Sequence, residues 1–136
     1  MNRLAGTLLQ CHTNSAISKL VISLDNCIVT AVIIDFIHYG DDVIAGAKVD
    51  VLFKESETAI AYLLPPGVLS IRNRLPCRVL AVDDDGLIAT VKLDFNGRMI
   101  ESIITSESAS ELCLRPGKDV FALVKSTEVM VEKGMA

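Results

Sequence analysis

The 136-residue sequence contains none of the short motifs that mark common catalytic sites. A phosphate-binding GxxxxGK[ST] loop, a dinucleotide-binding GxGxxG turn, a zinc-binding HExxH helix and a GxSxG nucleophile turn are all absent. The chain has two histidines, and neither recurs at the equivalent position of the internal repeat described below. Since no nucleophile, base or metal constellation can be assembled, we do not expect an enzyme.

Long apolar runs are also missing, although the mean hydropathy is high at +0.46. The most apolar run, Cys27 to Ile37, is about half as long as a membrane-spanning helix requires, and it contains Asp35. The N-terminus carries one arginine and a short apolar stretch but no convincing cleavage site for a signal peptide. We therefore expect no signal peptide and no insertion in a membrane.

A basic surface and a cysteine framework are absent as well. The formal net charge of −4 argues against a nucleic-acid-binding protein, because such proteins depend on cationic contacts with phosphate. The four cysteines form no CxxC pair and do not coincide between the repeats, so we expect reduced thiols that pack as small apolar side chains. The alternative is a metal cluster, whose spacing fits no standard site, made of Cys11, His12, Cys27 and His38.

The chain does contain an internal repeat with an offset of 71 residues, in which Asn73-Arg74-Leu75 repeats Asn2-Arg3-Leu4. We predict a degenerate first repeat over residues 1–64, a linker over 65–69 and a second repeat over 70–136. Because about 65 residues is near the lower limit for independent folding, we expect the repeats to pack together or to oligomerise. Without gaps, the same offset aligns Leu9 with Leu80, Ile17 with Ile88, Ile33 with Ile104, Gly46 with Gly117, Val49 with Val120, Leu52 with Leu123, Lys54 with Lys125 and Glu57 with Glu128.

The first repeat reads as a series of short strands. Ile17 to Leu24 alternates between apolar and polar residues, as a half-buried strand does. Ile28 to Ile34 is a β-branched run, which is typical of a strand buried on both faces. A polar turn is predicted at His12 to Ser15, and a short helix or turn at Phe36 to Val43.

The second repeat shows the same series of short strands, with clearer turn signals between them. Asn96-Gly97 is a strong hairpin signal between two strands. Ser106 to Leu112 has helix character, with Ser108 and Glu111 as a capping box. Because no strand alternates with a long helix, we predict an all-β fold: two tandem OB-like small barrels of five strands, each with one short helix.

Hydrogen-bond donors and cations gather at the ends of the elements of the second repeat: Ser70, Arg72, Thr105, Ser108, Lys125 and Ser126. A tetrahedral oxyanion needs such donors, one or two cations and no buried carboxylate, and a helix N-terminus adds backbone N–H groups. The alternative is that these residues only cap turns and carry surface charge. The first repeat lacks the donors, since Ile34, Ile37 and Glu55 take the places of Thr105, Ser108 and Ser126.

The same segments resemble a molbindin (Mop, or TOBE) domain over residues 70 to 132. The resemblance is carried by Ser70-Ile71-Arg72-Asn73, Ile103 to Ser108, Leu114 to Lys118 and Ala122 to Ser126. Members of that family bind molybdate or tungstate at interfaces between small OB-like barrels. The resemblance therefore implies oxyanion ligands at Ser70, Arg72, Asn73, Thr105, Ser108, Lys125 and Ser126. The alternative for Asn73 is a structural role instead of a ligand role, because the degenerate repeat retains an asparagine, Asn2, at the equivalent position.

The whole chain is similar to a tandem di-Mop arrangement, such as the C-terminal regulatory half of molybdate transporter ATPases. The resemblance implies a cytoplasmic homo-oligomer, a dimer or a trimer, that binds molybdate or tungstate for storage, buffering or sensing. The alternative is a regulatory interaction module that has lost anion binding and docks on molybdate transporter components. No cation held directly by side chains, no nucleic acid and no membrane insertion are expected.

Overall fold

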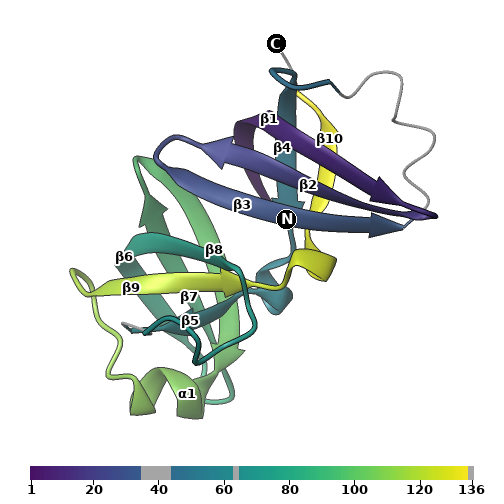
Figure 1. Ribbon diagram of the computed structural model, residues 1–136. Helices are drawn as coiled ribbons and strands as arrows, with labels where there is room; N and C mark the ends of the chain where they lie inside the picture. The colour runs from purple at the N-terminus through teal and green to yellow at the C-terminus, as the bar shows by residue number, and fades with distance from the viewer. Residues whose placement is uncertain (35–43, 63–64, 135–136) are drawn as a thin grey trace.

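The computed structural model describes residues 1–34, 44–62 and 65–134, which form two five-stranded antiparallel sheets (Figure 1). The first sheet has the order β10-β4-β1-β2-β3 and the second the order β5-β9-β6-β7-β8. The first contains β1 (Asn2–Asn14), β2 (Ile17–Leu24), β3 (Cys27–Ile34), β4 (Lys48–Phe53) and β10 (Met130–Lys133). The second contains β5 (Ala59–Ala61), β6 (Asn73–Asp84), β7 (Ile88–Phe95), β8 (Arg98–Thr105) and β9 (Asp119–Val124).

Three short helical elements complete the described chain: α1 (Ser106–Glu111) and the 3-10 turns η2 (Glu55–Glu57) and η3 (Ser126–Glu128). The predicted helix or turn at Phe36 to Val43 lies outside the described residues. Within the described part of the chain, no helix has the length and apolar character needed to cross a membrane. The all-β prediction is confirmed.

The internal repeat is present in the backbone as well as in the sequence. Strands β2, β3 and β4 begin and end 71 residues before β7, β8 and β9, and η2 stands in the same relation to η3. The irregularity in the first strand pairing also repeats, since the register shifts between Leu8 and Gln10 and again between Val79 and Ala81. The buried apolar side chains of both sheets form one continuous core.

The two sheets exchange their last strands. Strand β10, from the end of the second repeat, pairs with β4 of the first and places Met130 opposite Leu52. Strand β5, from the end of the first repeat, pairs with β9 of the second and places Ala59 opposite Leu123. Each sheet is therefore completed by a strand from the other repeat.

Two predictions for the first repeat were wrong in detail. Strand β3 is not buried on both faces: Val29 and Ala31 are buried, whereas Ile28 and Ile34 are exposed. The run is β-branched because that composition favours a pleated strand, and β3 is an edge strand with only one face on the core. The turn predicted at His12 to Ser15 is shorter, because β1 continues to Asn14 before pairing back with Ile17.

Two buried asparagines, Asn73 and Asn2, join each sheet to the edge strand of the other. Asn73, at the start of β6, accepts the backbone N–H of Thr30 at 2.8 Å and donates to the carbonyl of the same residue at 2.9 Å. Asn2, at the start of β1, accepts from and donates to the backbone of Glu101, with both distances 2.8 Å. Each carboxamide therefore satisfies the outer edge of β3 or β8, where no further strand pairs among the residues that the structure describes.

We predict that Asn73→Ala and Asn2→Ala each lower the free energy of unfolding by about 2–4 kcal/mol, because each leaves a backbone N–H and a backbone C=O without a partner. Urea denaturation of each variant measures the loss. Asn14→Ala, at the exposed end of β1, is the control and should change stability by about 0.5 kcal/mol or less. A loss as small as the control's for Asn73→Ala would contradict this role.

We also predict that the two sheets open as one cooperative unit, because each contains a strand of the other repeat and both share one core. Hydrogen exchange followed by mass spectrometry in rising urea should give the amides of β2 and β7 the same opening free energy. Loss of protection in one of these strands, while the other stays protected, would show that the repeats are independent domains.

Candidate functional site

Thr105 and Ser108 lie together at the start of the helix. Thr105 is the N-cap of α1: its hydroxyl accepts the backbone N–H of Ser108 at 3.1 Å and donates to the Ser108 hydroxyl at 2.9 Å. The predicted capping box was wrong, because the helix begins at Ser106 and the cap is the residue before it. Since Thr105 gives its hydrogen to Ser108, the Ser108 hydroxyl is the one able to donate outward.

A second group of predicted residues meets where the two sheets join. Ser126 is the first residue of η3, and its Oγ lies 2.6 Å from Oγ1 of Thr30. Asn73 holds the backbone of Thr30, and the Thr30 hydroxyl lies 3.4 Å from the Asn73 Oδ1. Lys125, immediately before η3, is exposed beside them. This junction therefore brings Asn73, Lys125 and Ser126 to a strand of the first repeat.

Thr30 was not among the residues predicted from the sequence. Its contacts with Asn73 and Ser126 span 43 and 96 residues, so no local spacing indicates them. The offset alignment did not indicate it either, because Glu101 stands in the place of Thr30 in the second repeat. The one available signal is that Thr30 is the only polar residue in the aliphatic run of β3.

Arg72 reaches the same junction. An open pocket of about 420 Å³ is lined by two arginines, one hydroxyl side chain and no carboxylate: Ile28, Thr30, Pro66, Gly67, Leu69, Ile71, Arg72 and Arg74. Arg74 donates to the carbonyls of Ile71 and Leu69 at 3.2 and 3.3 Å, and so holds the segment that carries Arg72. Ser70 is exposed within that segment.

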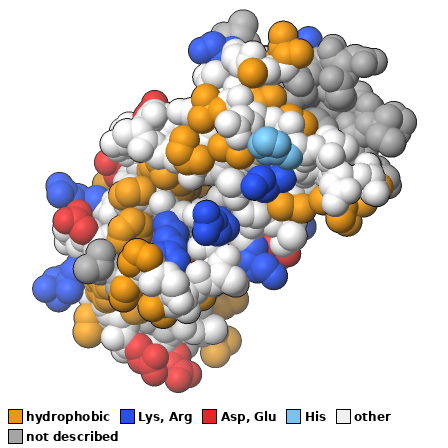
Figure 2. Space-filling view, in the orientation of Figure 1, with side chains coloured by type: hydrophobic (Ala, Val, Ile, Leu, Met, Phe, Trp, Pro, Cys, Tyr) orange, Lys and Arg blue, Asp and Glu red, His pale blue; other side chains and the backbone are white. Residues whose placement is uncertain are grey.

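The predicted donors form two groups within one chain. Thr105 and Ser108 lie at α1, which Figure 1 shows at the end of the second sheet that points away from the first. Arg72, Lys125 and Ser126 belong to the junction, where η3 lies between the sheets (Figure 1). Among the described residues, no hydrogen bond or ion pair joins one group to the other. On the face shown in Figure 2, cationic side chains gather near the junction, whereas acidic ones lie mainly at the rim.

The pseudo-equivalent junction of the other repeat carries carboxylates instead. There, Asn2 clamps Glu101 in the way that Asn73 clamps Thr30, and Glu55 stands in the place of Ser126. The Glu55 carboxylate lies 2.6 Å from the Met1 ammonium, and the hydrogen bond between them lowers the pKa of Glu55. Ionised carboxylates accept hydrogen bonds but cannot donate them, so Glu55 and Glu101 offer an oxyanion none of the donors that Thr30 and Ser126 provide at the other junction.

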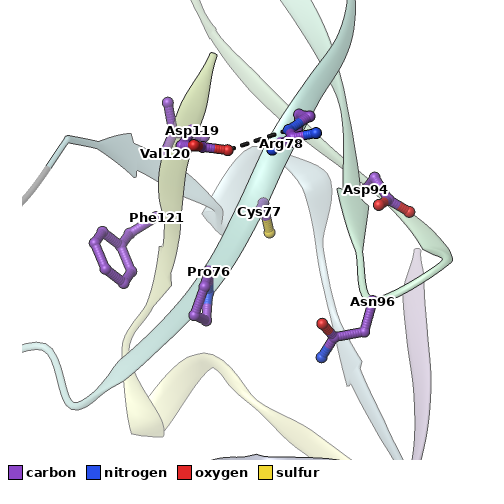
Figure 3. Close-up of a pocket in the computed structure, with 8 residues that line it drawn as sticks. All are labelled: Pro76, Cys77, Arg78, Asp94, Asn96, Asp119, Val120 and Phe121. Carbon is purple, nitrogen blue, oxygen red and sulfur yellow. Dashed lines mark hydrogen bonds and ion pairs between the residues drawn. The ribbon is translucent and has the colours of Figure 1, made fainter. Parts of the chain in front are cut away.

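The pocket in Figure 3 is also unsuited to an oxyanion. Its volume is about 430 Å³, and it contains an ion pair of 3.2 Å between Arg78 and Asp119, which compensates the cation. Asp94 adds a second carboxylate to the wall. Burial raises the pKa of Cys77 to about 12, so this thiol is protonated and packs as a small apolar side chain.

The other cysteines give no metal site within the described residues. Cys11 and Cys113 are exposed and Cys27 is half-buried, and none of the four forms a disulfide. In the described part of the chain, no three histidine, cysteine or acidic side chains come close enough to hold a metal ion. The alternative cluster also included His38, which lies outside the described residues.

Comparison with known proteins finds a matching domain model and several similar proteins. Residues 69–131 match the model of the TOBE domain. The chain is 38% identical over 87 residues to the molybdenum-pterin-binding protein MopB of Rhodobacter capsulatus, a match over 63% of this chain and 32% of MopB. It is 42% identical over 65 residues to the molybdenum import ATP-binding protein ModC of Brucella abortus, over 47% of this chain and 18% of ModC. The chain therefore spans about a third of MopB and less than a fifth of ModC.

A solved structure shares the complete fold. It is the cytoplasmic molybdate-binding protein ModG with molybdate bound, which superposes with a TM-score of 0.89 at 24% identity, over 98% of this chain and 96% of that one. A smaller relative, the probable molybdenum-pterin-binding protein of Haemophilus influenzae, is 33% identical over 64 residues, which are 46% of this chain and 93% of the relative. Since the match covers nearly the whole of that relative, and residues 69–131 match the domain model, the chain belongs to the Mop (TOBE domain) family.

Proposed function

We propose that the second repeat binds a tetrahedral oxyanion, molybdate or tungstate, and that the chain serves storage, buffering or sensing of that anion in the cytoplasm. The observation that carries the proposal is the contrast between the two junctions. One offers Arg72, Lys125 and Ser126, whereas the pseudo-equivalent junction offers Glu55 and Glu101. The role is binding rather than catalysis, in agreement with the named binding functions of MopB and ModG.

Each group has a distinct task in the proposed site. Arg72 and Lys125 offset the charge of the dianion, and Arg72 provides planar N–H donors suited to oxyanion oxygens. The hydroxyls of Ser70, Ser108 and Ser126 donate to the remaining oxygens. Asn73 fits the structural alternative better than the ligand role, since Thr30 occupies both ends of its carboxamide. Thr105 acts by capping α1 and holding Ser108.

The separation of the donors into two groups supports a site shared between copies of the chain. The α1 group of one copy would meet the junction group of another, which makes the functional form a homo-oligomer, a dimer or a trimer. Such an arrangement would bring Ser108 of one copy to Arg72, Lys125 and Ser126 of another without moving either group within its own chain.

A second candidate function is supported by the match to ModC. The part of ModC that resembles this chain is a small portion of a molybdenum import protein. A regulatory module built on this fold would contact molybdate transporter components rather than hold the anion. The two candidates differ in whether the isolated protein binds molybdate.

We predict that Arg72→Ala and Lys125→Ala each weaken molybdate binding by at least about tenfold, because each removes a charge-assisted hydrogen bond worth about 1.5–3 kcal/mol. Isothermal titration of the intact oligomer with sodium molybdate, with sodium sulfate in parallel, measures the affinity. Arg78→Ala is the matched control, since Arg78 is an exposed arginine already paired with Asp119, and it should retain the wild-type affinity.

Absence of molybdate binding by the wild-type protein would overturn the oxyanion proposal and favour the regulatory module. Unchanged affinity in the Arg72→Ala, Lys125→Ala double variant would also contradict it, because binding would then take place elsewhere.

A further inference from the structure

The hydroxyl of Thr30 lies between two residues of the other repeat. Its Oγ1 is 2.6 Å from the Ser126 Oγ and 3.4 Å from the Asn73 Oδ1. The backbone of Thr30 is held at both its N–H and its carbonyl by the Asn73 carboxamide. The position of this hydroxyl is therefore set mainly by the two backbone hydrogen bonds to Asn73, which would remain if the hydroxyl were removed.

The direction of the hydrogen bond between Thr30 and Ser126 decides what Ser126 can do. A hydroxyl has one hydrogen, so Ser126 can donate either to Thr30 or to an anion, but not to both. Thr30 can donate to Ser126 or to Asn73, and the Asn73 oxygen already accepts the Thr30 N–H at 2.8 Å. At 2.6 Å, the bond to Ser126 is the shorter of the two that Thr30 can make. When Thr30 donates, the hydrogen of Ser126 is available to an anion.

Accepting a hydrogen bond also makes a hydroxyl a better donor, because the members of a hydrogen-bonded chain polarise one another. Both Thr30 and Ser126 are half-buried, so solvent competes only in part for their hydrogens. An anion beside Ser126 would stabilise the order Thr30 to Ser126 to anion. Without the anion, the reverse order, Ser126 to Thr30 to Asn73, satisfies the same three groups.

We propose that Thr30 of the first repeat is a positioning residue for the anion site of the second repeat. It fixes the Ser126 hydroxyl at the junction and turns its hydrogen toward the anion. This inference rests on the proposed oxyanion function. It assigns a role in binding to the repeat that has lost its own donors.

At the pseudo-equivalent junction the asparagine contact is present, but the pair of hydroxyls is not. Asn2 holds the backbone of Glu101 with the same two bonds, yet the side chains at the positions of Thr30 and Ser126 are Glu101 and Glu55. The clamp is thus common to both junctions, whereas the pair of hydroxyls is present only beside Arg72 and Lys125. If the hydrogen bond between Thr30 and Ser126 served stability alone, it would not need to lie at the junction that carries the cations.

The test compares three single variants by isothermal titration of the intact oligomer with sodium molybdate. Thr30→Val keeps the shape and the backbone clamp but removes the hydroxyl, and it should weaken binding about three- to tenfold, the loss expected for one neutral hydrogen bond. Thr30→Ser retains the hydroxyl and should bind within about twofold of wild type. Thr13→Val is the matched control, because it breaks the similar Thr13–Ser18 hydroxyl pair, 2.9 Å long, in the distant β1–β2 hairpin.

A double-mutant cycle shows whether Thr30 acts through Ser126. In a Ser126→Ala background, Thr30→Val should cause no further loss of affinity, whereas independent effects would multiply. Equal affinities of wild type and Thr30→Val would overturn the inference while the proposed function stands. The same fold-loss from Thr30→Val with and without Ser126 would also overturn it. If the wild type fails to bind molybdate, both the proposed function and this inference fall.

Discussion

The side-chain amides of two buried asparagines hold the two halves of the molecule in register with each other. Asn73 uses both ends of its carboxamide on the backbone of Thr30, and Asn2 does the same for Glu101. A carboxamide matches a backbone N–H and C=O pair as a neighbouring strand would, so it closes the edge of a sheet without adding a strand. The relation between the sheets, and therefore the junction that carries Ser126 and Lys125, depends on these contacts.

The exchange of the last strands also holds the two halves of the molecule together. Because β5 completes the second sheet and β10 completes the first, the repeats share hydrogen bonds as well as a core. Two halves that are too small to bury much apolar surface alone thereby form one larger unit. The first repeat therefore supports the second, because its strand β5 belongs to the second sheet.

The sequence predicted the elements of this fold better than their pairing. Alternation identified β2, the β-branched run identified β3, and the Asn96-Gly97 signal identified the hairpin of β7 and β8. That turn was correct because positive φ at both residues is a local property of the dipeptide. The exchange of β5 and β10 was not predicted, because either strand would satisfy the pattern equally well in its own sheet. The exposed outer face of β3 was missed for a similar reason: β-branched residues indicate a strand but not how many faces are covered.

For the candidate site, too, the sequence indicated individual residues better than the contacts between them. The offset comparison picked out Thr105, Ser108 and Ser126 as hydroxyls that the first repeat lacks, and the structure places the first two in contact with each other. It could not reveal Thr30, whose role arises only when β3 packs against η3. Nor could it reveal that the opposite junction combines Glu55 with Glu101, since these residues are 46 positions apart in the chain.

We propose that an oxyanion binds at the cationic junction of the second repeat and not at its acidic counterpart. Anomalous X-ray diffraction at the molybdenum absorption edge, from crystals grown with molybdate, tests this claim most directly. We expect an anomalous peak within hydrogen-bonding distance of Ser126 and Lys125, with none beside Glu55 and Glu101. A peak at the acidic junction, or the absence of any peak near Ser126 in crystals that contain bound molybdate, would contradict it.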